Sequence, residues 1–430
     1  MSTKENLSSL PESLQPLVPS SGFTGPIIWW NHHLGFGGVE RQICATAQAL
    51  SEKLDGKADL QLLCEHLDSE DSTAGLEQAT PFFANVSDIF SNAPLYRENS
   101  AKALRAAEQN FSGLHPVRQQ LIAMYAAYFA LTKPRLLQVW NADYIHVALA
   151  AVLAGVPNIL MRCASKSPGF RHPKGIESVN DKLAHQAFCY LCRFPSFFMT
   201  ANSKEGLEDY RNWLGLPPGS IEYTPNAFVP EQWQQGKDGE SLRASLGIPP
   251  QAPVIGGIFR FSFTKNPQLW VQTAFNILEA NRECYAILAG DGELHAEIQD
   301  MVRNSPYASR LLMPGMLADT AAFYDACDVL LHTSRCEGQC NVVLEAQFHR
   351  LPVICTDCGG PSEIITDKKT GFIVREHDPN ILAAHVLYAL NNPEWSAAAG
   401  EHGRASVTRT FSPRRSALTY FRIYSERGCV

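Results

Sequence analysis

The sequence predicts an α/β protein with two parallel sheets, each covered by helices. Short apolar segments alternate with helix-like segments from residue 26 onward, which is the pattern of parallel strands joined by crossover helices. A stretch at residues 223–239, rich in Pro, Asn, Gln and Gly, interrupts this alternation, and the same pattern restarts after it. A length of 430 residues fits two or more domains. We therefore expect two α/β halves that face each other across one ligand crevice, because ligands bind outside the carboxyl ends of such strands.

The first half is expected to follow a loose tail at residues 1–24, which is polar, rich in Pro and Ser, and without the apolar core of a signal peptide. Strands are expected at residues 26–30, 60–64, 136–140, 158–161 and 197–201, and helices at residues 39–50, 145–154 and 178–194. Residues 70–130 show a mostly helical pattern, to which the sequence assigns no role.

The second half is expected to repeat this alternation. Its strands are predicted at residues 254–259, 284–289, 311–313 and 329–332, and its helices at residues 267–280, 295–303 and 320–327. A polar break at residues 336–339 then precedes another helix, which Asn341 is expected to cap. Glu337 is thereby placed at a strand-to-helix turn, and Glu345 lies about two turns further along, on the helix.

Composition excludes several classes of protein. The chain has 36 basic and 43 acidic residues and a net charge of −7, which argues against a nucleic-acid partner. No apolar run approaches the roughly 20 residues of a membrane-spanning helix. The twelve cysteines, without an export signal, are expected to be reduced thiols in the cytoplasm. The two CxxC pairs, Cys189/Cys192 and Cys355/Cys358, are too far apart for a zinc ribbon, so we expect packed thiols and no metal site.

Glu337 and Glu345 are the most informative residues of the chain. The amides at the start of the helix that follows Glu337 form an anion site. One carboxylate beside such a site can accept hydrogen bonds from sugar hydroxyls, and a second can accept them from ribose hydroxyls. This arrangement predicts a pocket for a sugar nucleotide.

The same segment resembles the donor site of the group 1, or family four, retaining glycosyltransferases of the GT-B fold. The residues that carry the resemblance occur in the family's order: Glu337, Glu345, Leu351-Pro352-Val353, Gly359-Gly360, Glu363 and Thr370-Gly371. The resemblance extends over about residues 26–425 and is much closer in the second half. It implies two Rossmann-like domains, an acceptor-side domain at residues 25–225 and a nucleotide-sugar donor domain at residues 226–407. It also implies that residues 408–430 form a helix that returns to the first domain.

The resemblance assigns roles to residues of the second half. Glu337 is expected to hold the donor sugar and Glu345 the ribose. Arg260 and Lys265 are expected to hold the diphosphate, a task that the enzyme must give to fixed cations or to a metal. No Asp-x-Asp of the metal-dependent kind follows a strand, so no metal and no cofactor are expected. Further donor-binding residues are expected at Gly290, Gly292, Gly338, Gln339, Cys340, Asn341 and Val342.

The first half matches the family less closely. Gly37 and Gly38 resemble the family's glycine loop, whose amides approach a phosphate or the acceptor. Many members carry a His after a Val-Pro strand, but here Arg162 stands in that neighbourhood. Trp140 and Asp143 match a branch of the family that has Arg at this point.

Arg162 is therefore expected to contact the donor phosphate or the acceptor, and an ion pair with Asp143 is the alternative. Trp140, Asp143, His172 and Lys174 are expected on the acceptor side. Asn226, in a Pro-Asn-Ala where the family has Pro-Asn-Gly, is expected to shape the hinge between the two halves.

The function that the resemblance implies is retaining transfer of a sugar from a nucleoside diphosphate donor, with a uridine diphosphate sugar favoured. The implied acceptor is a hydroxyl of a glycan or a lipid-linked molecule in surface polysaccharide biosynthesis. The expected location is the cytoplasm, with peripheral contact at the inner face of the membrane where the acceptor is lipid-linked. Two alternatives stay open: a nucleotide-sugar epimerase on the same fold, and a non-catalytic sugar-nucleotide-binding partner.

Overall fold

A computed structural model describes residues 10–11, 13–34, 38–54, 59–67, 79–171, 179–233 and 238–430. The predicted site residues Gly37, His172 and Lys174 lie outside these ranges. The chain forms two compact units. The first comprises Met1–Ala227 and Pro413–Val430, and the second comprises Phe228–Ser412.

The described part of the first unit contains a seven-stranded parallel sheet in the order β3-β2-β1-β4-β5-β6-β7. Its strands are β1 (Gly25–Asn31), β2 (Leu60–Cys64), β3 (Asn85–Asp88), β4 (Pro134–Val139), β5 (Ile159–Cys163), β6 (Phe197–Ala201) and β7 (Ile221–Tyr223). Its helices are α1 (Gly38–Leu54), α3 (Ala93–Asn110), α4 (Pro116–Thr132), α5 (Ile145–Ala154), α6 (Pro168–Arg171), α7 (Val179–Leu191), α8 (Lys204–Leu214) and α16 (Pro413–Glu426).

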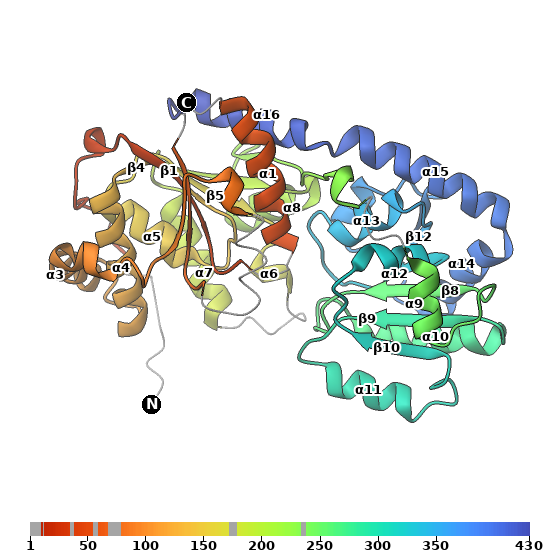
Figure 1. The fold of residues 1–430 in the computed structure, drawn as a ribbon. Coiled ribbons are helices and arrows are strands. Elements are labelled where there is room, and N and C mark those ends of the chain that lie inside the picture. The colour runs from red at the N-terminus through yellow and green to blue at the C-terminus, as the bar shows by residue number, and fades with distance from the viewer. Residues whose placement is uncertain are drawn as a thin grey trace. The chain divides into compact units, whose positions relative to one another are not determined.

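Both faces of this sheet are buried, because successive side chains of a strand point to opposite faces. Ile27 and Trp29 of β1 pack in one layer with α1 and α16. Ile28 and Trp30 pack in the other layer, with α3, α4, α5 and α7. The C-terminal helix α16 lies beside α1 (Figure 1), so the first unit is completed by the last segment of the chain.

The second unit has a six-stranded parallel sheet in the order β10-β9-β8-β11-β12-β13. The strands are β8 (Val254–Ile258), β9 (Tyr285–Ala289), β10 (Leu311–Gly315), β11 (Val329–His332), β12 (Val353–Thr356) and β13 (Gly371–Val374). The helices are α9 (Gly239–Ser245), α10 (Pro267–Ala280), α11 (His295–Arg303), α12 (Thr320–Ala326), α13 (Asn341–Phe348), α14 (Pro379–Asn391) and α15 (Pro393–Thr410).

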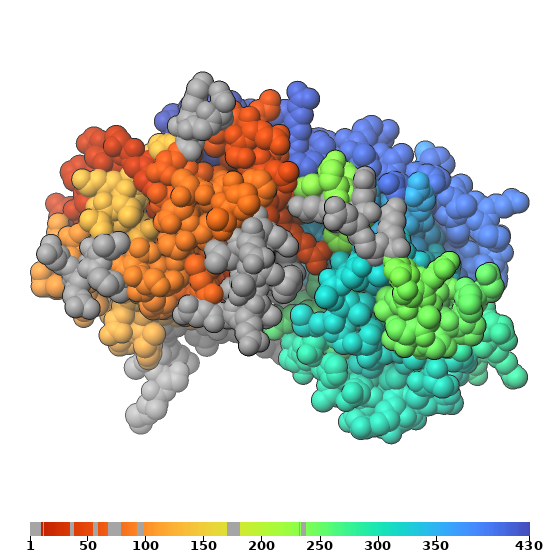
Figure 2. Space-filling view, viewed as in Figure 1, coloured from red at the N-terminus to blue at the C-terminus, as the bar shows by residue number. Residues whose placement is uncertain are grey.

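Helices also cover both faces of the second sheet. Helices α10, α11 and α14 pack on one face, and α12, α13 and α15 pack on the other. Helix α11 lies on the outside of the unit (Figure 2) and buries only the stripe of Ile298 and Val302. This stripe is the pattern of an amphipathic helix that covers a sheet.

The predicted fold class, two parallel α/β sheets with a C-terminal helix returning to the first, is confirmed. Several elements differ from expectation or were not predicted, among them two strands and a helix cap. β3 is a polar edge strand, and β7 has three residues, so neither has the apolar run that marks a buried strand. The expected cap of α13 was wrong: Cys340 is the N-cap residue, and Asn341 is the first residue of the helix.

Within the described ranges, none of the helices combines the length and the hydropathy that crossing a bilayer requires.

Candidate functional site

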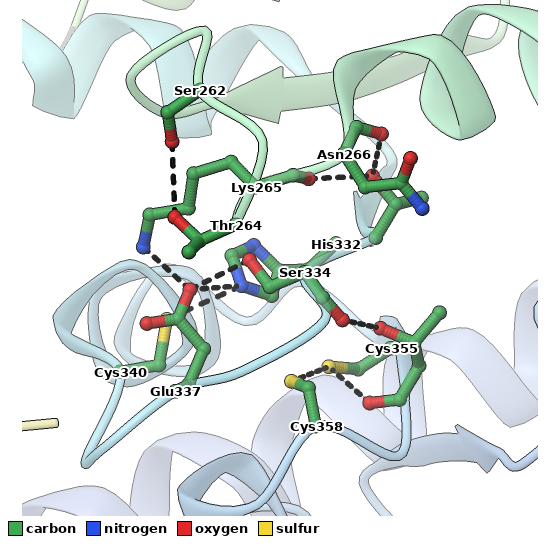
Figure 3. Close-up of polar contacts among 12 residues, drawn as sticks. Ser262, Thr264, Lys265, Asn266, His332, Ser334, Glu337, Cys340, Cys355 and Cys358 are labelled. Atoms are coloured by element: carbon green, nitrogen blue, oxygen red, sulfur yellow. Dashed lines mark hydrogen bonds and ion pairs between the residues drawn. The ribbon is translucent and has the colours of Figure 1, made fainter. Parts of the chain in front are cut away.

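The loops that follow β8 and β11 bring a lysine and a glutamate together in the second unit. These strands are neighbours at the centre of the sheet, so their carboxyl ends meet at one edge. Lys265 lies in the loop after β8, and Glu337 lies in the loop after β11. The Lys265 Nζ atom is 2.5 Å from Glu337 Oε1 (Figure 3). The structure therefore places two of the predicted donor-site residues in direct contact.

Lys265, Ser334 and His332 all contact the same oxygen of Glu337. Ser334 Oγ donates to Glu337 Oε1 at 2.6 Å, and His332 Nε2 lies 3.0 Å from the same atom. The other carboxylate oxygen makes no contact with the residues drawn in Figure 3. The Glu337 side chain is only 12% exposed. The carboxylate is thus fixed through one oxygen, and the second can accept a hydrogen bond from a ligand.

Each charged group in this cluster favours the charged form of its neighbours. Burial alone would raise the pKa of Glu337, but Lys265 and His332 outweigh it and hold that pKa below its usual range. Burial would lower the pKa of Lys265, and the Glu337 carboxylate instead raises it. Burial likewise opposes protonation of His332, but nearby Cys340 and Glu337 raise its pKa to about 9. A buried carboxylate and an ammonium therefore both stay charged at neutral pH.

The loop that carries Lys265 is tied to the end of β11. Asn266 adopts a left-handed conformation with φ of 54°, just before α10. Arg335 Nη2 donates to Asn266 Oδ1 at 2.7 Å, and the Arg335 amide donates to the Thr264 carbonyl at 2.8 Å. Thr333 Oγ1 donates to the Asn266 carbonyl at 3.2 Å. These bonds fix the backbone on both sides of Lys265.

The turn that carries Glu337 is tied to the loop after β12. The Glu337 amide donates to the Cys358 carbonyl at 2.8 Å. Gly360 lies so close to Gly338 that an added Cβ would be 2.0 Å from the Gly338 carbonyl oxygen. Glycine at position 360 is therefore required by backbone packing beneath the candidate site.

The other predicted donor residues near Glu337 line the start of α13. Gln339 and Cys340 are buried, and Asn341 and Val342 are partly buried in the first turn. Glu345 is buried further along α13, and its Oε2 atom accepts a hydrogen bond from the Tyr324 hydroxyl at 2.7 Å.

Arg260 is exposed on the surface of the second unit. Its side chain is 76% exposed, and its Nε atom is 3.5 Å from Glu293 Oε2. Gly290 and Gly292 have φ of 127° and 155°, and a Cβ at Gly290 would be 2.1 Å from the Phe259 carbonyl oxygen. These glycines are thus explained by the close packing of the loop after β9 against the loop after β8.

In the first unit, Arg162 ends up buried. Its guanidinium lies 4.7 Å from the centre of the Trp140 ring, and its Nη2 atom donates to Asn226 Oδ1 at 2.6 Å. Among the described residues Arg162 forms no ion pair with Asp143. Trp140, predicted on the acceptor side, is instead a fully buried core residue packed against Trp29, because it continues the apolar face of β4.

Two further predicted residues of the first unit are described. Gly38 is the first residue of α1, and Asp143 is exposed in the turn before α5.

The comparisons with known proteins agree with this geometry. Residues 238–406 match the family model of the glycosyl transferases group 1. The second unit therefore carries a group 1 glycosyltransferase domain. It is 27% identical over 388 residues to a Vi polysaccharide biosynthesis protein of Salmonella typhi, an alignment that covers 84% of this chain and 64% of that protein. It is 31% identical over 140 residues to an uncharacterised glycosyltransferase of Methanocaldococcus jannaschii, covering 32% of this chain and 40% of that protein. The chain thus spans less than two thirds of either relative.

Solved structures show the fold. The structure of Anabaena HepE in complex with UDP-glucose matches with a TM-score of 0.72 and 19% identity, over 94% of this chain and all of that one (100%). Staphylococcus aureus TarM matches with a TM-score of 0.71 and 12% identity, over 93% of this chain and 99% of that one. The predicted GT-B fold is thereby confirmed.

Sequence reasoning missed His332 and Ser334 of this site. His332 was assigned to the end of an apolar strand and Ser334 received no role, whereas both contact Glu337 Oε1. Their polarity at the carboxyl end of a buried strand was the signal that could have found them. His332, Glu337 and Cys340 also present ligand atoms within 4.8 Å of one another, the one such group in the described ranges. The sequence predicted no metal-capable group here.

Proposed function

We propose that this protein is a group 1 glycosyltransferase that moves a sugar from a nucleoside diphosphate donor to a hydroxyl of a glycan or lipid-linked acceptor, with retention at the anomeric carbon. The observation that carries the proposal is the buried Glu337 carboxylate, paired with Lys265 at the carboxyl ends of β8 and β11. A uridine diphosphate sugar is the proposed donor, since HepE was solved with UDP-glucose and TarM with UDP. Surface polysaccharide is the proposed product, since a relative acts in Vi polysaccharide biosynthesis.

Lys265 serves the leaving group. Transfer breaks the bond between the sugar C1 and a phosphate oxygen, and negative charge grows on the phosphate as that bond breaks. An ammonium has three N–H donors, so Lys265 can keep Glu337 and still donate to a phosphate oxygen. Arg260 supplies a second cation when it exchanges its surface contact with Glu293 for the diphosphate. With these two cations, the reaction that we propose is metal-independent.

Glu337 and Glu345 bind two other parts of the donor, the sugar and the ribose. The second oxygen of Glu337 accepts a hydrogen bond from a sugar hydroxyl, and Glu345, oriented by Tyr324, accepts from the ribose. The acceptor hydroxyl attacks C1 from the face that the diphosphate leaves. Its proton passes to the departing phosphate oxygen, which balances the exchange of the two C–O bonds without a protein base.

Arg162 gives the first unit a place for an anion. It is a buried guanidinium whose contacts in the described residues include no carboxylate. An unpaired buried charge is costly, and a ligand anion would offset that cost. We assign Arg162 to a donor phosphate or to an anionic group of the acceptor. We also assign Asp143, His172 and the glycine loop at Gly37 and Gly38 to the acceptor side.

The test uses the intact purified chain and UDP-sugars, with and without a glycan acceptor. Transfer with retained anomeric configuration, seen by NMR of the product, supports the proposal. Lys265→Ala should lower kcat by about 10²–10³, as expected for loss of one contact to a developing charge. A new nucleotide sugar formed from donor alone would instead identify an epimerase, and donor binding without any turnover would identify a non-catalytic partner.

A further inference from the structure

Three side chains of different chemistry converge at the carboxyl end of β11. His332 is the last residue of that strand, Glu337 lies in the turn, and Cys340 is the N-cap of α13 (Figure 3). His332 Nε2 is 3.0 Å from Glu337 Oε1 and 3.6 Å from Cys340 Sγ. All three residues are buried. The proposed reaction gives no chemical role to the His332 imidazole or to the Cys340 thiol.

The spacing of these atoms suits a metal ion. Zn²⁺ bonds of about 2.0–2.3 Å in a tetrahedron place neighbouring ligand atoms about 3.3–3.7 Å apart. The two separations from His332 need only small adjustments to reach that range, and the third lies within 4.8 Å. Imidazole, thiolate and carboxylate are the three ligand types that Zn²⁺ takes in proteins, and three protein ligands with one open position form a common set. We propose that His332, Glu337 and Cys340 form a binding site for Zn²⁺ that closes the donor site when it is filled.

The resident cation of the cluster is Lys265. Its ammonium lies 2.5 Å from Glu337 Oε1, the same oxygen that faces His332. A metal ion bonded to that oxygen would lie within a few ångströms of the ammonium, and two cations there repel each other. Zn²⁺ therefore displaces Lys265 from Glu337. The thiol proton of Cys340 and the Nε2 proton of His332 leave to solvent as the two side chains bond to the metal.

The consequence for activity rests on the proposed function, whereas metal binding does not. If Lys265 and Glu337 hold the donor, then a bound Zn²⁺ removes the carboxylate from the sugar and the ammonium from the diphosphate. Zn²⁺ is then an inhibitor that competes with the donor, although the reaction itself uses no metal.

Another Cys–His pair in the chain provides a matched control. Cys189 Sγ lies 3.7 Å from His185 Nε2, close to the separation in the proposed site. That pair is in α7 of the first unit and belongs to no metal-capable group of the described residues. Comparing the two pairs therefore distinguishes a three-ligand site from the general affinity of thiols and imidazoles for metals.

Metal binding is tested with Co²⁺, whose bond to a thiolate gives a charge-transfer band. The metal-free full chain should bind one Co²⁺ with this band, and Zn²⁺ should remove it by displacement. Cys340→Ser should lose the band and Cys189→Ser should keep it. Lys265→Met, which lacks the competing ammonium, should bind about tenfold more tightly. An unchanged band in Cys340→Ser, or no band in the folded wild-type chain, overturns the site.

A second variant guards against loss of folding in Cys340→Ser. His332→Gln should weaken Co²⁺ binding at least about tenfold, since it removes one of three ligands. Circular dichroism of both variants reports whether they are folded. Unchanged Co²⁺ affinity in folded His332→Gln contradicts the proposed ligand set.

Inhibition is tested separately in the transferase assay. Zn²⁺ should raise the apparent KM for the donor, and EDTA should restore the original value. Activity that is lost in EDTA and restored by Zn²⁺ would overturn the inhibitory role. A Co²⁺ band in a chain that shows no transfer under any condition would leave the metal site standing and count against the proposed function instead.

Discussion

At the scale of single residues, the geometry around Glu337 separates two carboxylates that look alike in the sequence. Glu337 is held by three donors on one oxygen, beside the cation proposed to meet the diphosphate. Glu345 is held by the Tyr324 hydroxyl on a neighbouring helix. A carboxylate that acts where charge develops changes turnover, whereas one that acts equally in ground and transition states changes binding.

Glu337→Gln should therefore lower kcat by about 10²–10³ and leave the affinity for bare UDP nearly unchanged, since the sugar is absent. Glu345→Gln should mainly raise the KM for the donor and weaken UDP binding by about tenfold. Tyr324→Phe should act in the same direction as Glu345→Gln, with a smaller effect. Calorimetric titration with UDP and steady-state kinetics measure both quantities.

Glu401→Gln is the control for these variants, because Glu401 pairs with Arg350 on the surface. It should behave as the wild type in both measurements. Loss of UDP binding in Glu337→Gln together with normal binding in Glu345→Gln would show that the two roles are reversed.

A second residue-scale prediction concerns His146, whose ring packs against Trp30 and Tyr125. Burial, Arg118 and His32 lower its pKa to about 4. Between that value and the unfolded pKa of about 6.5, the unfolded state binds more protons, so stability falls as pH falls through this window. At about pH 5 the loss should be up to roughly 2 kcal/mol.

Urea unfolding of the wild type, His146→Gln and His402→Gln at about pH 5 and about pH 7.5 checks this prediction. Only His146→Gln should lose part of the acid sensitivity, since His402 is exposed on α15. Equal acid sensitivity in all three proteins would contradict the role of His146.

Sequence patterns located some of these residues and not others, for physical reasons. The resemblance to the group 1 family assigned Lys265 and Glu337 to one donor site before their contact was seen. His332 was missed, because its polarity at a strand end is a weak signal that is also compatible with an ordinary core histidine. Trp140 was misplaced because the sequence does not show that its ring meets Trp29.

At the scale of elements, the loop between β8 and α10 positions Lys265 through one strained residue. Asn266 has φ of 54°, a region that costs a residue with a Cβ about 1 kcal/mol. Its side chain accepts a hydrogen bond from Arg335 of the loop after β11. The pairing of the two loops, and not the lysine alone, sets the ammonium beside Glu337.

Asn266→Gly and Asn266→Ala separate the two contributions. Both lose the bond to Arg335, and both should lower kcat because Lys265 is less fixed. Only the alanine adds backbone strain, so it should be less stable than the glycine variant by about 1 kcal/mol. Thermal unfolding and steady-state kinetics measure the two effects.

Lys133 provides the matched control, since it also has positive φ, 48°, but caps α4 in the first unit. Lys133→Gly and Lys133→Ala should differ in stability in the same way without changing kcat. A normal kcat in both Asn266 variants would show that the strained residue does not position Lys265.

Helices and strands could be predicted where their apolar residues recur with the period of a helix or form the short run of a buried strand. Helix α10 and strand β11 were predicted with their observed bounds, because their apolar residues follow one period. The edge strands β3 and β7 were not predicted. An edge strand forms by pairing with a neighbouring strand, and the local sequence does not show that pairing. The cap of α13 was also missed: Cys340 holds the N-cap position without a side-chain cap bond, one residue before Asn341, which is the better capping residue.

At the scale of the whole molecule, the first unit is built from both ends of the chain. Helix α16 places Tyr420 and Tyr424 in the layer formed with α1 and β1. The Trp29 Nε1 atom donates to the Tyr424 hydroxyl at 2.9 Å, and that hydroxyl donates in turn to Gln138. The first unit therefore depends on residues that follow the second unit in the sequence, whereas the second unit is one continuous segment.

Tyr424→Ala should therefore destabilise the first unit selectively. Removing a fully buried aromatic side chain costs about 3–5 kcal/mol, and here it also leaves the Gln138 oxygen and the Trp29 N–H without their partner. Hydrogen exchange measured by mass spectrometry should show faster exchange in β1, β4 and α1, while protection in β8, β11 and α10 stays as in the wild type. Leu418→Ala is the control, since Leu418 is exposed on the same helix and should leave both patterns unchanged. Loss of protection in both units at once would show that they unfold as one cooperative body, and unchanged protection in the first unit would show that α16 is dispensable for it.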